Sequence, residues 1–195
     1  MTVIIDYDAG NIKSVSCALS RLGAEYELTD DPAKIISADR VILPGVGSAG
    51  QAMRSLQEKD LVKVIRSLRK PVLGICVGMQ IMCSHSEEGD VGCLDIFDTS
   101  VKRFPDDSLA KVPHMGWNKL SNLDSKLFKG MKGGCSVYFV HSYRPDLCPD
   151  TIATCRHGRT LFSAALKYEN FYGTQFHPEK SGGVGEQILK NFLAL

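Results

Sequence analysis

A cysteine between two glycines is the first feature of the sequence that could do chemistry. The motif Gly-Ile-Cys-Val-Gly occupies residues 74–78 and follows a short apolar run. The pattern Gly-x-nucleophile-x-Gly is typical of a strand that turns sharply into a helix and holds the nucleophile in a strained conformation. A helix N-terminus favours the thiolate form of Cys76, and the N–H of Val77 would serve as an oxyanion donor. The motif therefore predicts a thiol nucleophile, with a buried structural cysteine as the alternative.

A second motif supplies the groups that such a thiol needs. The run 171–176 resembles a strand, and His177, Pro178 and Glu179 follow it directly. A thiol nucleophile needs an imidazole to carry the proton and a carboxylate to hold the tautomer of that imidazole. We therefore predict that Cys76, His177 and Glu179 form a catalytic triad. The other histidines are interpreted as structural; they are His85, His114, His141 and His157.

The third feature is the glycine-rich turn 44–50, which follows the apolar run 41–43 and contains a literal Gly-x-Gly-x-x-Gly. A dinucleotide-binding turn is disfavoured, because the turn follows the second apparent strand and the next strand ends at Cys76 instead of an acid that could hold a ribose. We interpret it as a turn whose backbone N–H groups, at Val46 and Gly47, face a developing negative charge. An ordinary loop is the remaining alternative.

The elements that must position these groups alternate along the chain. Short apolar runs at 2–6, 41–43 and 71–75 predict buried strands, and helical periodicity follows each of them, with one long helix expected over 53–68 and another from about Gly78. Further β-like runs lie around 96–104, 136–140, 160–165 and 171–175, and an amphipathic helix ends the chain. We predict an α/β fold: one domain of residues 1–195, with a mostly parallel central sheet, helices on both faces and some antiparallel strands in the C-terminal half.

Composition narrows the class of protein. The 195 residues carry 23 Lys and Arg against 22 Asp and Glu, a net charge of +1, which argues against a nucleic-acid partner. No apolar run approaches the length of a membrane span, and the N-terminus has no secretory pattern, so we expect a cytoplasmic protein. Seven cysteines without a Cys-x-x-Cys pair fit reduced thiols, and we expect neither a metal nor an organic cofactor.

Taken together, the motifs resemble those of the class I (triad) glutamine amidotransferases. The residues that carry the resemblance are Gly-Ile-Cys-Val-Gly-Met-Gln at 74–80 and His-Pro-Glu-Lys-Ser at 177–181, and the likeness extends over the whole chain. It implies a three-layer, flavodoxin-like arrangement. It also implies that glutamine is hydrolysed to glutamate and ammonia through a thioester on Cys76. In such a site Gln80 and Glu88 would hold the amino-acid end of glutamine, with the backbone of Ser142 and Tyr143.

Within that family, the chain is similar to glutaminase subunits that dock on a (βα)8-barrel cyclase as a heterodimer. Ammonia passes through the barrel to a ribonucleotide, and the products are imidazole glycerol phosphate and an aminoimidazole carboxamide ribonucleotide, on the path to histidine. The match is carried by the opening segment 6–11, by Pro-His-Met-Gly-Trp-Asn at 113–118 and by Val-His-Ser-Tyr at 140–143. The resemblance places four residues at the partner interface: Asn11, Trp117, Tyr138 and Lys180.

Three other functions stay open at this point. One is a glutaminase subunit that feeds ammonia to a different synthetase, because the acceptor chemistry belongs to the partner. Another is a stand-alone cysteine hydrolase, which would need no partner. The third, a non-catalytic interaction subunit, is disfavoured by the intact residues Cys76, His177 and Glu179.

Overall fold

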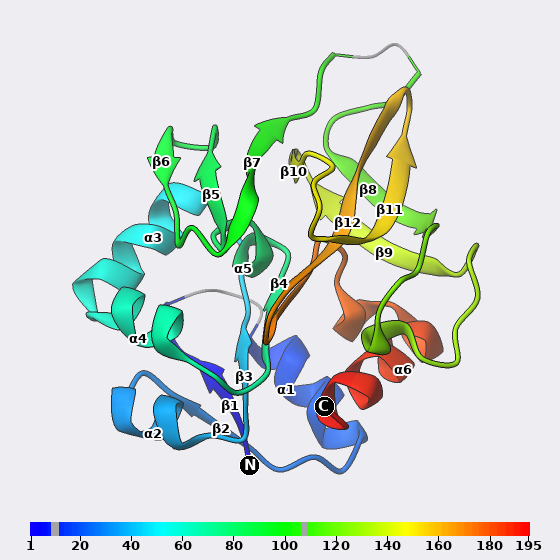
Figure 1. The fold of residues 1–195 in the computed structure, drawn as a ribbon. Coiled ribbons are helices and arrows are strands. Elements are labelled where there is room, and N and C mark those ends of the chain that lie inside the picture. The colour runs from blue at the N-terminus through cyan, green and yellow to red at the C-terminus, as the bar shows by residue number, and fades with distance from the viewer. Residues whose placement is uncertain (9–11, 107–108) are drawn as a thin grey trace.

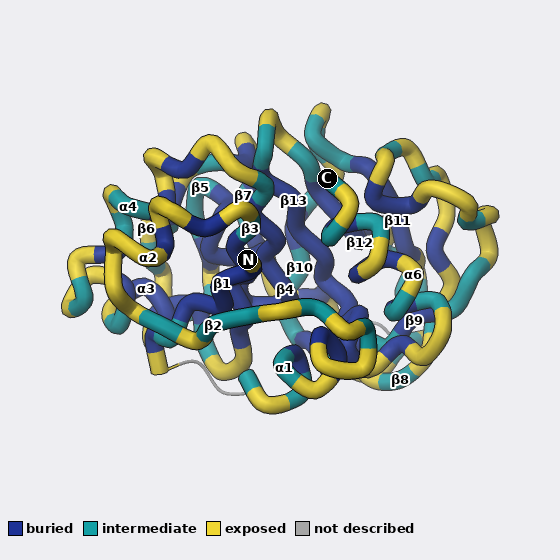
Figure 2. The backbone as a smooth tube through the Cα atoms, turned by 90° about the horizontal axis from the view of Figure 1, so that it is seen from below, coloured by how far each residue is buried: buried dark blue, intermediate teal, exposed yellow. Residues whose placement is uncertain are grey.

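The computed structural model describes residues 1–8, 12–106 and 109–195. A seven-stranded sheet runs through its centre in the order β11-β12-β13-β4-β3-β1-β2, and its middle strands are dark blue, fully buried segments in Figure 2. Five strands are parallel, and β11 and β12 are antiparallel additions at one edge. The strands are β1 (Thr2–Ile5), β2 (Tyr26–Thr29), β3 (Arg40–Leu43), β4 (Val72–Ile75), β11 (Thr151–His157), β12 (Thr160–Tyr168) and β13 (Phe171–Thr174).

Helices cover both faces of this sheet, as Figure 1 shows. The helices α1 (Ile12–Arg21) and α6 (Gly182–Leu193) lie on one face, where both contact the 3-10 turn η2 (Pro178–Lys180). On the other face lie α2 (Pro32–Ser37), α3 (Ala49–Glu58) and α4 (Leu61–Ser67). The α/β class, the mostly parallel sheet and the antiparallel C-terminal strands expected from the sequence are confirmed.

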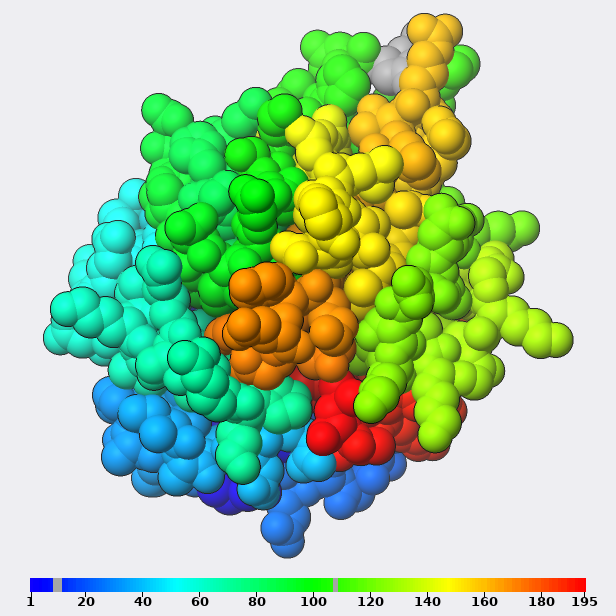
Figure 3. Space-filling view, in the orientation of Figure 1, coloured from blue at the N-terminus to red at the C-terminus, as the bar shows by residue number. Residues whose placement is uncertain are grey.

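Two smaller sheets stand on the carboxyl-end side of the central one. The first has the order β10-β7-β5-β6 and is built from β5 (Cys83–Ser86), β6 (Val91–Gly92), β7 (Phe97–Arg103) and β10 (Tyr143–Pro145). The second is the antiparallel pair β8 (His114–Lys119) and β9 (Ser136–His141), and the 3-10 turn η1 (Lys126–Phe128) lies between its strands in sequence. In the space-filling view of Figure 3, the orange segment around the turn from β12 to β13 lies at the surface. It is flanked by teal and green residues from the first half of the chain and by the yellow-green segment between β8 and β9.

The structure differs from the sequence prediction at two helices. The expected helix over 53–68 is divided into α3 and α4, because Asp60 adopts a left-handed conformation with φ 55°. The helix expected from Gly78 is a single turn, α5 (Val77–Gln80), and the chain enters strand β5 at Cys83. In addition, β2 and α2 precede β3, so the glycine-rich turn follows the third strand and not the second. Among the described residues, no helix is long and apolar enough to cross a membrane.

Candidate active site

Cys76 lies between β4 and α5, with φ 55° and ψ −111°. A positive φ is unusual for a residue with a side chain and is typical of a strained nucleophile turn. The turn is held by three backbone hydrogen bonds: the N–H of Cys76 donates to the carbonyl of Thr174 at 2.7 Å, and its carbonyl accepts from Met79 and Gln80 at 3.0 Å. The side chain is 4% exposed. The strained turn expected from the glycine-flanked motif is therefore present.

Three glycines let the backbone pass around this turn. A Cβ at Gly78 would lie 1.9 Å from the carbonyl oxygen of Leu43, and one at Gly45 would lie 2.3 Å from the nitrogen of Gly78. A Cβ at Gly74 would lie 2.7 Å from the carbonyl oxygen of Gly78. All of these neighbours are backbone atoms of packed strands or turns, which have no room to move aside. The glycines therefore bring the turn after β3 against the turn that carries Cys76.

The predicted oxyanion residues Val46, Gly47 and Val77 line the same pocket as Cys76. Gly47 has φ 90°, a conformation that favours glycine. Beneath the turn, the buried hydroxyl of Tyr7 donates a hydrogen bond to the carbonyl of Pro44. Burial, and then the charge of Cys76, raise the pKa of Tyr7, so the phenol stays protonated and keeps this bond.

His177 and Glu179 form a buried pair at the end of β13. The Nδ1 of His177 lies 2.7 Å from the Oε1 of Glu179, and the two side chains are 1% and 0% exposed. Burial lowers the pKa of His177, but hydrogen bonds and charge from Cys76 and Glu179 outweigh it and raise that pKa to about 9. Nε2 of His177 is buried, and no described residue gives it a hydrogen bond of regular geometry. It is thus the ring nitrogen left for the Cys76 thiol.

Ser181, a motif residue to which the sequence analysis gave no role, holds this segment. Pro178 starts the turn η2, which brings Glu179 back beside the imidazole ring. The hydroxyl of Ser181 donates to the carbonyl of His177 at 2.6 Å and accepts from the N–H of Tyr138 at 2.9 Å. The N–H of His177 in turn donates to the carbonyl of Tyr138 at 2.9 Å. The imidazole is therefore anchored to β9 from both sides.

These groups surround one cavity of about 280 Å³. Apart from Glu179, which lies behind the imidazole of His177, every residue that the sequence analysis assigned to chemistry or to glutamine lines it. The lining residues are Val46, Gly47, Cys76, Val77, Gln80, Glu88, Val140, His141, Ser142, Tyr143 and His177.

Gln80 and Glu88, expected to hold the amino-acid end of glutamine, are both fixed by the protein. The Nε2 of Gln80 donates to the carbonyl of Tyr143 at 2.8 Å and to the Oε1 of Gln175 at 3.0 Å, so its amide oxygen is the atom left for a ligand. The Oε2 of Glu88 accepts from the N–H of Ala49 at 3.0 Å, at the start of α3. A held carboxylate and an amide oxygen suit an ammonium group.

Two histidines interpreted from the sequence as structural form a chain that reaches this cavity. The Nδ1 of His141 donates to the carbonyl of Tyr143 at 2.8 Å, so its Nε2 accepts from the Nδ1 of His114 at 2.9 Å. The Nε2 of His114 then accepts from the Nδ2 of Asn118 at 3.0 Å. The side chain of Asn118 is itself oriented, since its Nδ2 also donates to the carbonyl of Arg156 and its Oδ1 accepts from the N–H of Lys119.

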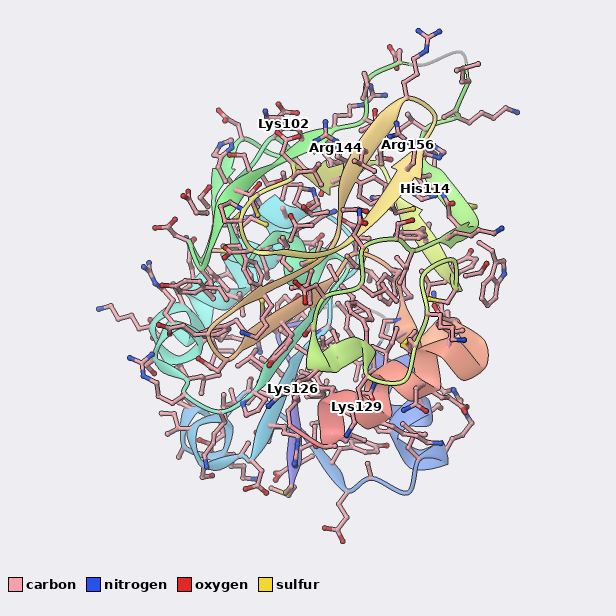
Figure 4. The ribbon with its side chains drawn as sticks, turned by 45° about the vertical axis from the view of Figure 1, so that its right-hand side comes forward. Lys102, His114, Lys126, Lys129, Arg144 and Arg156 are labelled. Atoms are coloured by element: carbon pink, nitrogen blue, oxygen red, sulfur yellow. The ribbon has the colours of Figure 1, made fainter. Side chains whose placement is uncertain are left out.

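The chain consists of neutral imidazoles with one donor direction. Burial lowers the pKa of His114 to about 3, and burial also holds the pKa of His141 well below its usual value. In Figure 4, His114 on β8 is labelled near Arg156 on β11, and Lys102 and Arg144, which both pair with Asp146, are labelled on the side of β7 and β10. The structural interpretation of His141 was incomplete, because this side chain also lines the cavity. Its partners are 27 and 2 residues away, and no local motif marks the longer link.

Three of the four predicted interface residues lie together beside the site. Trp117 on β8 is 58% exposed and packs edge-on against Tyr138 on β9, with ring centroids 6.1 Å apart. It also lies next to Gly182, which follows the exposed Lys180 by two positions in the sequence. Trp117 is therefore not part of the core. Asn11, the fourth residue, lies outside the described residues.

Within the part of the chain that the structure describes, no group of three or more His, Cys, Asp or Glu side chains could hold a metal ion. The arrangement offers a thiol, an imidazole, a carboxylate and backbone N–H groups around one cavity. These are the components of nucleophilic acyl transfer.

Comparison with known proteins identifies the family. Residues 3–195 match the family "Glutamine amidotransferase class-I". The chain belongs to this family, a class of α/β enzymes. The structure also resembles a solved structure described as a glutamine amidotransferase, with a TM-score of 0.74. The match covers 98% of this chain and 97% of that one, and because the two sequences are 18% identical it shows the fold alone.

Two relatives that share about half of their residues with this chain both belong to one kind of subunit within the family. The chain is 54% identical over 193 residues to the imidazole glycerol phosphate synthase subunit HisH of Bacteroides thetaiotaomicron, and it covers 98% of both chains. It is 48% identical to the HisH subunit of Idiomarina loihiensis, covering 99% of this chain and 97% of the relative.

Proposed function

We propose that this chain is the glutaminase subunit of an imidazole glycerol phosphate synthase. It would hydrolyse glutamine and pass the ammonia to a (βα)8-barrel cyclase subunit, in a heterodimer that serves histidine biosynthesis. The observation that carries the proposal is that the thiol of Cys76 and the imidazole of His177 line the same cavity, in a chain that matches HisH relatives over 98% of its length. We also propose that residues 1–195 act as one domain.

The site residues take the following roles in this proposal. The thiolate of Cys76 attacks the side-chain amide carbon of glutamine, and the N–H groups of Val77 and of the turn at Val46 and Gly47 hold the oxyanion. Protonated His177, oriented by Glu179, gives its proton to the departing ammonia. It then activates a water molecule that releases glutamate from the thioester. The raised pKa of His177 supports this role, since the imidazolium is present at neutral pH.

We propose glutamine-binding roles for residues that line the cavity and a partner role for residues beside it. The amide oxygen of Gln80, the carboxylate of Glu88 and the backbone of Ser142 and Tyr143 would bind the amino-acid end of the substrate. The aromatic pair of the exposed Trp117 and the half-buried Tyr138, with Lys180, would contact the cyclase, because aromatic side chains are enriched at interfaces. Asn11 belongs to the same proposed interface.

We further propose that the protein works in the cytoplasm and needs no cofactor. All seven cysteines lie in described segments and are free thiols, which suits a reducing compartment. Neither a membrane nor a nucleic acid is required as a partner by this reaction.

Glutamate release from glutamine tests the proposal directly. The purified chain is assayed alone, with the barrel cyclase, and with the cyclase plus its ribonucleotide ligand. We expect strong stimulation in the third mixture, and loss of glutamate release in Cys76→Ala and nearly so in His177→Ala, with folding intact. Equal activity in all three mixtures would indicate a stand-alone hydrolase or another acceptor enzyme, and full activity of Cys76→Ala would refute the catalytic assignment.

Two surface variants separate the partner from the chemistry in this assay. Trp117→Ala should weaken binding of the cyclase by about tenfold or more, the effect of removing an interface aromatic anchor. Tyr168→Ala removes an exposed aromatic from the far end of β12 and should bind as the parent protein does. Equal affinity of both variants for the cyclase would mean that the interface does not include the strands β8 and β9.

A further inference from the structure

Gln175, the residue after β13, contacts the nucleophile. Its side chain is 0% exposed, and its Nε2 lies 3.8 Å from the Sγ of Cys76. Its backbone N–H donates to the carbonyl of Ala164 at 2.9 Å, and the carbonyl of the preceding Thr174 accepts from the N–H of Cys76. The amide group is therefore held beside the sulfur by two neighbouring strand pairings. No motif in the sequence marked this residue.

The orientation of the Gln175 amide follows from its partners. The carbonyl of Tyr143 can only accept, so the Nε2 end of Gln80 must face it. The same Nε2 group donates to Gln175, so the oxygen of the Gln175 amide faces Gln80. The N–H end of Gln175 is consequently the end that faces the Sγ of Cys76.

Resting on the function proposed above, we infer that Gln175 is a catalytic residue that donates a hydrogen bond to the thiolate of Cys76, and that Gln80 orients it. A hydrogen bond to the charged form of a group favours that form. As a thiol, Cys76 has a different partner, the carbonyl of Val140 at 4.0 Å. When the thiol loses its proton, it can no longer donate to the carbonyl of Val140, and the thiolate accepts from the Nε2 of Gln175 instead. The pocket therefore provides a hydrogen-bond partner for the thiolate.

Other groups that act on Cys76 come from the elements packed around it. Next to the sulfur is the imidazole of His177, which carries Glu179 behind it. Tyr7 lies beneath the turn from β1, and its pKa responds to Cys76. His141 on β9 lines the same cavity. A test must therefore change Gln175 without changing these groups.

The pH dependence of Cys76 alkylation by iodoacetamide isolates this hydrogen bond. The rate is followed on the Cys76 peptide by mass spectrometry, so the exposed Cys17 does not contribute, and Cys76→Ala serves as the blank. In Gln175→Leu, which keeps the volume but has no donor, the pH midpoint of alkylation should rise by about one unit. The isosteric Gln175→Glu should raise it further, because a carboxylate repels the thiolate.

Thr174→Val is the matched control. It removes a buried hydroxyl that no described residue hydrogen-bonds, one position away, and should leave the midpoint unchanged. If Gln175→Leu does not fold, Gln175→Glu and Gln80→Leu carry the test, and both should raise the midpoint. An unchanged midpoint in a folded Gln175 variant would overturn the inference. Because alkylation needs no glutamine, this result is independent of the glutaminase assay.

Discussion

The buried imidazole of His177 is protonated at neutral pH because two partners, Cys76 and Glu179, raise its pKa. Burial alone would favour the neutral imidazole, whereas the hydrogen bonds and charges of Cys76 and Glu179 favour the imidazolium and raise the pKa to about 9. Of these two partners, Glu179 is the one that stays unchanged through the proposed reaction. In the proposed reaction, the carboxylate therefore helps to set the pH up to which His177 stays protonated.

Replacement of Glu179 by Gln tests this role at the scale of the residue. Glu179→Gln keeps the shape of the side chain but removes its charge, so the pKa of His177 should fall. We expect kcat for glutamine, measured in complex with the cyclase, to fall by about 10²-fold. The alkaline limb of the pH profile, between pH 6 and 10, should move to lower pH.

The exposed carboxylate of Glu186 provides the control for this measurement. It pairs with Arg21 at the surface at 3.6 Å, and Glu186→Gln should change neither kcat nor the pH profile. An alkaline limb that stays in place in Glu179→Gln would mean that the carboxylate does not act on the imidazole.

At the scale of elements, the site depends on how closely β3, β4 and α5 approach one another. The backbone of Gly78 lies against the carbonyl of Leu43, at a distance that leaves no space for a side chain. Cys76 and the turn proposed to hold the oxyanion follow two different strands, β4 and β3, and this contact brings them together. Strain at Cys76 and close packing at Gly78 are therefore parts of the same arrangement.

Gly78→Ala should be strongly destabilising for this reason. We expect the free energy of unfolding, measured by urea denaturation, to decrease by about 3 kcal/mol. Gly133→Ala is the control, since a Cβ there meets no atom within 4 Å and the backbone is not left-handed. Similar stabilities for the two variants would show that the turn relaxes more easily than its packing indicates.

The sequence was informative where chemistry leaves a local pattern. The motifs around Cys76 and His177 predicted the strand ends that carry them, because apolar runs next to glycine and proline mark such ends. The contact of Gln175 with Gln80 and the bond between His141 and His114 left no signal, although His141 and His114 lie in motifs that carry the resemblance, since each pair is distant in the sequence. The division between α3 and α4 was also missed, because the apolar positions continue across the left-handed Asp60.

For the whole molecule, the histidines make stability depend on pH in two opposite directions. His114 has a folded-state pKa of about 3, below its unfolded value of 6.5, so the unfolded state binds more protons between these values. Its contribution is present above pH 6.5 and is lost as the pH falls toward 3. His177, with a folded-state pKa of about 9, contributes below pH 6.5 and loses that contribution as the pH rises through 9.

We therefore expect the free energy of unfolding to be largest near pH 6.5, as far as these two histidines determine it. Urea denaturation at a series of pH values from 4.5 to 9 checks this. His114→Gln should make the acid side of the curve less steep, with the remaining slope due to His141, whose pKa burial also lowers, and should leave the alkaline side as it was. An acid side that stays equally steep would assign the loss of stability to other groups.

The hydrogen bonds that run in one direction from Asn118 through His114 and His141 to Tyr143 limit which substitutions evolution can accept. Each member must donate toward the cavity and accept from the side away from it. A replacement that reverses one link, such as a carboxylate for an imidazole, leaves two acceptors facing each other at the next link. Among single replacements at His114 and His141, those that keep one donor and one acceptor, such as Gln, preserve the direction of the chain, whereas a carboxylate should be rare among descendants that keep the pocket.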